Sequence, residues 1–143
     1  MKLDKAGIDF LHAREGYRSK PYLDTKGIPT IGYGNTHYPD GRKVTMQDKP
    51  LTPELAEQLF HAIVDPLEKQ INALIKTKLT QNQYNAIVSF TYNVGIGALS
   101  SSTALKRINA NPNDPTIREA LMRFNKPPEI IGRRKMEADL YFS

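Results

Sequence analysis

The segment that organises this chain is residues 15–35, which read EGYRSKPYLDTKGIPTIGYGN. It places two carboxylates, a β-branched hydroxyl residue and four glycines in just over twenty residues. Glu15 follows an amphipathic run, Asp24 lies in the turn sequence D-T-K-G, and Thr30 comes six residues later. A β-hairpin that folds back toward the end of a helix would bring these three side chains to one cleft. An acid and a base that act on one glycosidic bond need such an arrangement.

The composition is that of a soluble globular protein, with 143 residues, 39% apolar and 24% charged residues. One domain of this length buries a substantial core. No apolar run approaches the roughly eighteen residues of a membrane span. The N-terminus, MKLDKAGIDFLHAREG, mixes charges among its apolar residues and does not resemble a signal peptide. We therefore expect the protein to stay in the cytoplasm where it is made, unless something else releases it.

Charge and residue content limit the chemistry. The chain has no cysteine, which excludes disulfides and thiolate catalysis. Its net charge of +5 and pI of about 9.4 favour a polyanionic partner, either nucleic acid, anionic lipid or a wall polymer. His12, His37 and His61 do not have metal-ligand spacing, and no H-E-x-x-H motif, nucleotide-binding glycine loop or G-x-S-x-G motif occurs. We expect neither a metal nor another cofactor.

The first third of the chain is predicted to form one helix followed by short strands. Apolar residues at helical spacing predict a helix over residues 3–14, which Gly16 is expected to end as a left-handed cap. Three short β-like pieces follow, at 22–23, 28–33 and 43–45, separated by turn sequences. They predict an antiparallel sheet of two or three strands, which is too small to be stable alone.

From residue 51 onward the pattern is helical. Thr52 and Pro53 are a predicted N-cap and first helical residue, and an apolar stripe then runs to about residue 75. Because an interior proline costs about 3 kcal/mol, Asp65–Pro66 predicts either a kink or two helices with Asp65 capping the second. Thr80 and Gln83 form a predicted capping box. Further helices are expected over about 102–109, up to about 124, and over about 129–140.

These elements predict an α+β fold that is mostly helical. A small antiparallel sheet lobe, about residues 12–60, would pack against a larger helical lobe, about 61–143 plus the N-terminal helix. The stripe at 53–75 would connect them, and residues 1–143 would form a single catalytic domain.

Three motifs in order resemble the phage-type lysozymes (endolysins) of glycoside hydrolase family 24. The first is Glu15-Gly16, then Tyr22-x-Asp24, then P-T-I-G-Y-G-N-T at 29–36. The second is the segment from Gln83 to Gly95, QYNAIVSFTYNVG, followed by S-S-T at 101–103. The third is G-R-R-x-x-E-x-x-L at 132–140. The resemblance spans nearly the whole chain and implies a lysozyme-like fold.

The resemblance implies the role of each side chain. Glu15 would be the general acid, which must be protonated at neutral pH and is therefore expected to be partly buried. Asp24 would remain ionised, stabilise positive charge at the anomeric carbon, and orient or deprotonate a water that the Thr30 hydroxyl holds. A water between carboxylate and sugar implies inversion, with roughly 6.5–9.5 Å between carboxyl groups rather than the about 5–5.5 Å of a retaining enzyme.

The resemblance also implies substrate contacts. Thr36, Tyr92 and Ser102 match positions that line the cleft, although Tyr92 also continues the apolar stripe of its own helix. Leu99 departs from the phenylalanine of many relatives, and the P-P-E segment at 127–129 is shorter than in many members. Arg133 and Arg134 suggest either an anion site or, the interpretation we favour, an ion pair with a nearby acid.

The implied function is a muramidase that cleaves the β-1,4 bond between N-acetylmuramic acid and N-acetylglucosamine in bacterial peptidoglycan. Such an endolysin is expected to act as a monomer, with no nucleic-acid partner and no stable membrane insertion. It would stay in the host cytoplasm until a holin releases it to the periplasm and wall. Two alternatives are a lytic transglycosylase on the same bond, against which Asp24 and Thr30 argue, and a non-catalytic basic module that binds wall or nucleic acid.

Overall fold

A short aspartate cap starts the first helix. In the computed structural model, which describes residues 1–143, α1 spans Lys5–Arg14. The Asp4 Oδ1 atom accepts a hydrogen bond of 2.8 Å from the Gly7 backbone N–H, so the helix begins at Lys5 and not at Leu3. Gly16 is not one of the glycines with positive φ. The predicted left-handed cap at Gly16 is therefore wrong.

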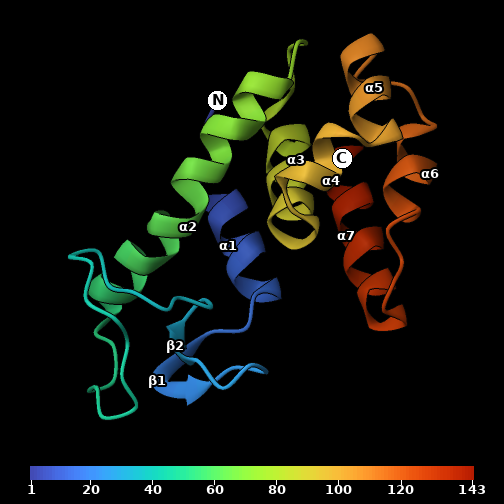
Figure 1. Ribbon diagram of the computed structural model, residues 1–143. Helices are drawn as coiled ribbons and strands as arrows, with labels where there is room; N and C mark the ends of the chain where they lie inside the picture. Colours follow the sequence, from blue (N-terminus) through green and yellow to red (C-terminus); the bar gives the residue numbers. More distant parts are fainter. The chain divides into compact units, whose positions relative to one another are not determined.

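The β-hairpin consists of β1 (Arg18–Leu23) and β2 (Pro29–Gly32), which pair antiparallel (Figure 1). Tyr22 lies opposite Thr30, and the register is irregular between Arg18 and Tyr22, where Pro21 has no N–H to donate. The sheet has only these two strands. Of the two or three strands expected, two form, and the piece at 43–45 adds no third because Lys43 forms only an isolated bridge with His37.

A small apolar core supports the hairpin. It consists of the buried residues Ile31, Tyr38, Val44 and Leu59, against which Leu51 and Leu55 pack. The T-I-G-Y-G-N segment enters this core through Gly32, whose φ is +69° and whose missing Cβ would lie 3.3 Å from the side chains of Leu51 and Leu59. A larger residue at 32 would be both strained and crowded.

One long helix, α2 (Pro53–Leu74), follows the hairpin, and Pro66 lies inside it. The cap at Thr52 is confirmed, because the Leu55 N–H donates to the Thr52 Oγ1 atom at 3.2 Å. Of the two alternatives at Asp65–Pro66, the second helix capped by Asp65 does not form. The Asp65 carboxylate instead lies 3.0 Å from the His61 ring one turn earlier, on the surface of the same helix.

The chain forms two structural units. The β-hairpin unit is His12–Pro66, and the helical unit is Met1–Leu11 together with Leu67–Ser143. After α2, the helical unit contains α3 (Gln81–Val94), α4 (Ile96–Ser100), α5 (Thr103–Ala110), α6 (Ile117–Met122), the 3-10 turn η1 (Pro128–Ile130) and α7 (Ile131–Tyr141). The short α4 is the one helix that the sequence pattern did not predict.

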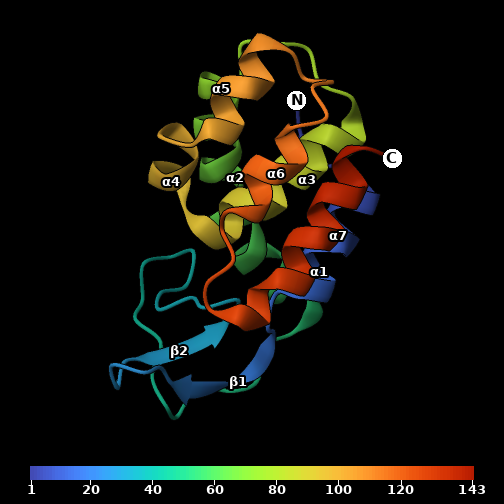
Figure 2. The same cartoon turned by 90° about the vertical axis from the view of Figure 1, so that its right-hand side faces the viewer.

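The core of the helical unit is α3, in which every residue from Gln83 to Thr91 is buried. It packs against α7, which in turn packs against α6, as Figure 2 shows. The predicted capping box is confirmed, since Thr80 accepts from the Gln83 N–H and the Gln83 side chain accepts from the Thr80 N–H. None of the helices combines the length and apolar character needed to cross a bilayer.

More than half of the residues are helical, and the remaining regular structure is one small antiparallel sheet. The predicted α+β class is therefore confirmed.

Candidate active site

Four of the six predicted site residues belong to the β-hairpin unit: Glu15, Asp24, Thr30 and Thr36. The other two, Tyr92 in α3 and Ser102 at the start of α5, belong to the helical unit.

The hairpin turn joins Asp24 to Thr30 through the backbone of Ile28. The Asp24 Oδ1 atom accepts hydrogen bonds from the N–H groups of Lys26 at 2.8 Å and Ile28 at 2.9 Å. The Ile28 carbonyl oxygen accepts from the Asp24 N–H at 3.0 Å and from the Thr30 hydroxyl at 2.8 Å. The backbone N–H and carbonyl of Ile28 thus hold the Asp24 carboxylate and the Thr30 hydroxyl in fixed positions relative to each other.

This arrangement determines which atoms remain for a ligand. The Asp24 Oδ1 atom is used by the turn, whereas no protein donor reaches Oδ2 of this half-buried side chain. The Thr30 hydroxyl donates its only hydrogen to the Ile28 carbonyl, so it can only accept a hydrogen bond from a water. The two side chains therefore offer two acceptor atoms, and a water has two hydrogens to donate to them.

Glu15 is half-buried and directly follows the last residue of α1. The end of that helix is held by His12, one turn before Glu15. The His12 ring stacks on Tyr33 with 5.3 Å between centroids and meets Phe60 edge-on at 4.5 Å. Its Nε2 atom also lies 3.6 Å from the Glu57 carboxylate.

These aromatic contacts connect three separate segments of the β-hairpin unit: the end of α1, the G-Y-G turn and α2. They centre on His12, one helical turn before Glu15 in the chain, and no sequence pattern predicted them. The only local signal was the spacing of three residues between His12 and Glu15, since Tyr33 and Phe60 are distant in sequence.

The predicted substrate-binding residues are in different environments. Thr36 is half-buried, with its hydroxyl oxygen 3.0 Å from the His37 Nδ1 atom. Ser102 is buried, and its hydroxyl donates to the Leu99 carbonyl at 2.7 Å while accepting from the Leu105 N–H at 3.0 Å. Ser102 is therefore the N-cap of α5. Tyr92 is half-buried near the end of α3. Their contact with a sugar stays a prediction.

The arginine pair forms an ion pair in the core of the helical unit, which confirms the favoured interpretation. Arg134 and Glu137 are fully buried and contact each other directly. The Arg133 Nε atom donates to the Glu137 carboxylate at 3.0 Å, and the Ser89 hydroxyl donates to it at 2.5 Å. Burial raises the pKa of Glu137, and the two guanidinium groups oppose that shift.

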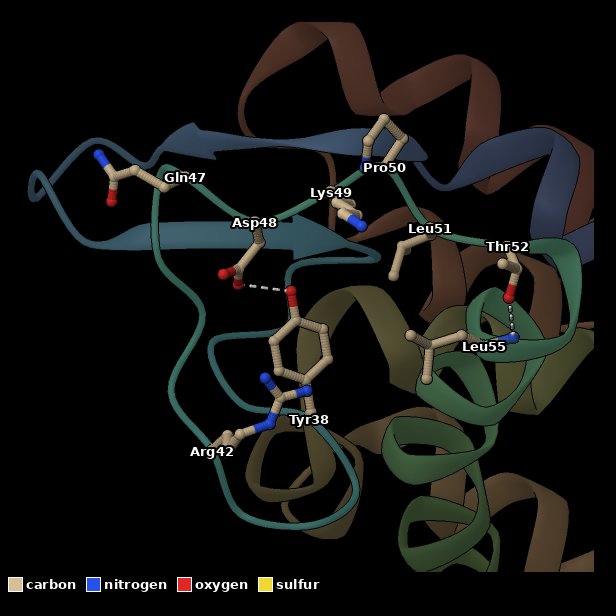
Figure 3. A pocket seen from close by; sticks show the side chains of 9 residues that line it. All are labelled: Tyr38, Arg42, Gln47, Asp48, Lys49, Pro50, Leu51, Thr52 and Leu55. Carbon is tan, nitrogen blue, oxygen red and sulfur yellow. Dashed lines mark hydrogen bonds between the residues drawn. The ribbon is translucent and has the colours of Figure 1, made fainter.

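Another carboxylate of the β-hairpin unit, that of Asp48, lines a pocket of about 380 Å³, shown in Figure 3. Asp48 accepts hydrogen bonds from the Tyr38 hydroxyl at 2.6 Å and from the Thr45 hydroxyl and N–H at 2.6 and 2.9 Å. These bonds lower the pKa of Asp48 to about 2, and burial together with Asp48 raises the pKa of Tyr38 to about 12. Asp48 is therefore a structural hydrogen-bond acceptor.

Comparison with known proteins places this geometry in a family. The sequence model of the family described as Phage lysozyme matches residues 12–137. The endolysin of Salmonella phage P22 is 34% identical over 147 residues, which cover 100% of this chain and 99% of the relative.

Solved structures give the same result. The endolysin from Escherichia coli O157:H7 phage FAHEc1 has a TM-score of 0.89 and 39% identity, covering 100% of this chain and 94% of that one. The muramidase domain of SpmX from Asticaccaulis excentricus has a TM-score of 0.76 and 30% identity, covering 99% and 98%. Together with the sequence match, these similarities show that the chain belongs to the phage lysozyme family.

Proposed function

We propose that this phage-type lysozyme hydrolyses the β-1,4 bond between N-acetylmuramic acid and N-acetylglucosamine by inversion at the anomeric carbon. Family membership makes the chain a muramidase of the endolysin type, which acts on bacterial peptidoglycan in host lysis. The proposal adds the roles of the side chains and the stereochemistry. In it, Glu15 is the general acid, and Asp24 with Thr30 holds the attacking water.

The observation that carries this proposal is the pair of acceptor atoms, Asp24 Oδ2 and Thr30 Oγ1. A water that donates one hydrogen to each presents its lone pair away from the protein, toward a bound sugar. Because Ile28 fixes both side chains, neither acceptor has to move when the water binds. Such a prearranged site positions the attacking water efficiently.

The proposed reaction balances with one water and no cofactor. The Glu15 carboxyl gives its proton to the glycosidic oxygen as the C–O bond breaks. The water oxygen attacks the opposite face of the anomeric carbon, and its proton passes to Asp24. Two proton transfers then restore Glu15 to its acid form and Asp24 to its carboxylate.

The remaining parts of the proposal concern the whole protein. We propose that residues 1–143 act as one monomeric catalytic domain, with Thr36, Tyr92 and Ser102 contacting the glycan. Release from the host cytoplasm to the wall would depend on a holin. Expression in a bacterium with and without a co-expressed holin tests this dependence: lysis that needs the holin is expected, and equal lysis without it would contradict this part.

Product analysis tests the reaction itself. The purified protein should clear outer-membrane-permeabilised Gram-negative cells, and mass spectrometry of the digested wall should show fragments that have gained one water. Fragments with a 1,6-anhydro end, which lack that water, would identify a transglycosylase and overturn the hydrolytic mechanism. Absence of any cleavage would leave only a binding module.

A further inference from the structure

The positive charge of the chain is unevenly distributed. The β-hairpin unit contains seven Lys or Arg and seven Asp or Glu residues, which gives a net charge of zero. The helical unit contains thirteen basic and eight acidic residues, so the whole net charge of +5 lies there. The unit that carries the charge is thus not the unit that carries Glu15, Asp24 and Thr30.

Most acids of the helical unit are already occupied by other partners. Glu119 pairs with Arg107 and Arg123, Asp139 pairs with Arg118, and Glu137 binds the two arginines of α7. The arginines are therefore largely neutralised by neighbours. The excess charge is left on lysines, and four of these form what we name the lysine surface: Lys69, Lys76, Lys78 and Lys106. All four are exposed, and none forms an ion pair.

The end of α2 and the end of α5 bring these lysines together. The Lys76 N–H donates to the Asn109 side chain at 2.7 Å, and that side chain donates to the Leu74 carbonyl at 3.0 Å. The Thr77 hydroxyl donates to the Ile108 carbonyl at 3.1 Å. Figures 1 and 2 both show the end of α2 beside α5.

The spacing of the lysines places them around this junction. Lys69 lies in the last two turns of α2, and Lys76 follows two residues after that helix ends. Lys106 is one turn before Asn109 on α5, and Lys78 follows two residues after Lys76. Because like charges on neighbouring elements repel, lysines gathered at one junction favour the binding of a polyanion.

A hollow of about 350 Å³ adjoins this surface. It is lined by Met1, Asn72, Ile75, Thr77, Lys78, Leu79 and Tyr84. Lys78 provides a cation at its rim, and the segment between α2 and α3 forms one wall. One of the four lysines, Lys78, therefore lies at a concavity.

We propose that the lysine surface is a non-catalytic binding site for peptidoglycan, whose stem peptides carry carboxylates. This inference rests on the proposed function, because the substrate polymer is the polyanion that a lysozyme meets at high local concentration. A nucleic acid fits less well, since the one aromatic ring at the hollow, Tyr84, is 1% exposed and offers no face for base stacking. The site would hold the enzyme on the wall between cleavage events.

The test compares two variants of equal charge. The first carries Lys76→Gln, Lys78→Gln and Lys106→Gln. The control carries Lys43→Gln, Lys126→Gln and Lys135→Gln, which remove the same three charges from other exposed positions. Both are made in a Glu15→Gln background, and co-sedimentation with purified sacculi, freed of other wall polymers, gives the affinity without any cleavage.

At about 50 mM salt we expect the first variant to bind sacculi roughly tenfold more weakly and the control to stay within about twofold of the parent. The difference should disappear near 1 M salt, where the Debye length is about 3 Å. Equal losses in both variants, or no loss in the first, would overturn the proposal. The proposal would also be overturned if the first variant lost affinity for a single-stranded oligonucleotide probe but not for sacculi. Failure of the hydrolytic mechanism would appear in the product analysis and not in this binding assay.

Discussion

The two units of this lysozyme differ in where their polar groups are held. In the β-hairpin unit, the half-buried Asp24 and the buried Thr30 are fixed by backbone groups of a short turn. In the helical unit, Arg134 and Glu137 are fully buried and are held by each other and by neighbouring side chains. With the proposed roles of Asp24 and Thr30, we expect catalysis and stability to be carried by separate residues. A substitution should therefore reduce either the lytic activity or the stability, and leave the other unchanged.

The largest expected effect is on catalysis. Glu15→Gln removes the proposed proton donor while keeping the size of the side chain, and loss of general acid catalysis costs about 10²–10⁴-fold in rate. The melting temperature should stay close to that of the parent. Turbidity decrease of permeabilised cells measures the rate, and circular dichroism measures the unfolding.

The matched control is Glu54→Gln, which neutralises an exposed glutamate in the first turn of α2 in the same unit. It should retain nearly full lytic activity. A Glu15→Gln protein that lyses cells as fast as this control would remove Glu15 from the mechanism.

The next effect is a loss of stability in the helical unit, with lytic activity retained. Glu137→Gln leaves Arg134 buried without its countercharge, and breaking a buried pair in this way costs about 3–5 kcal/mol. Denaturant unfolding should show this loss, while the protein that remains folded cleaves the wall at the parental rate. The exposed pair of Asp139 with Arg118 provides the control, because Asp139→Asn should cost at most about 1 kcal/mol. Equal losses would show that burial of the first pair has no energetic consequence.

A smaller effect compares the helix caps of the two units. Thr80→Ala removes a complete capping box and should cost about 1 kcal/mol of unfolding free energy, within the usual range for such caps. Thr52→Ala removes only a single exposed cap bond of 3.2 Å and should cost less. Thermal unfolding of both variants gives the order. The opposite order would indicate that α2 depends on its cap more than α3 does.

The smallest effect concerns acid and the β-hairpin unit. Since the pKa of Asp48 is lowered from 3.8 to about 2, its contribution to stability is complete above the unfolded value and is lost as pH falls toward 2. Asp48→Asn should therefore be less stable than the parent near neutral pH, with the gap closing between pH 4 and 2. Urea unfolding at several pH values measures the gap. A gap that stays constant over this range would contradict the assigned cause.

The comparison also separates what could be predicted from sequence. The caps at Thr52 and Thr80 depend on residues within one turn and were predicted correctly. Of the two alternatives at Asp65–Pro66, the second helix does not form because α2 continues through Pro66, and the piece at 43–45 adds no third strand because only Lys43 finds a partner. The anchoring of α1 by His12 depends on Tyr33 and Phe60, which are far away in sequence. No local pattern contains that contact.

The family motif predicted Asp24 and Thr30 as partners but not the atoms that join them. The two backbone bonds of Ile28 follow from the conformation of the turn, in which Gly27 has a φ of +77°. A pattern of residue types does not specify which oxygen of Asp24 the turn consumes. That detail decides how the proposed water is bound.

The stereochemistry of the first product tests most directly whether Asp24 and Thr30 hold the attacking water. Proton NMR of a soluble glycan fragment, recorded before the new reducing end equilibrates, distinguishes the two anomers. We predict that the first product of the β-1,4 bond has the α configuration, since water attacks from the opposite face. An initial product with the β configuration would mean that a carboxylate attacks the sugar itself, and would contradict the proposed mechanism.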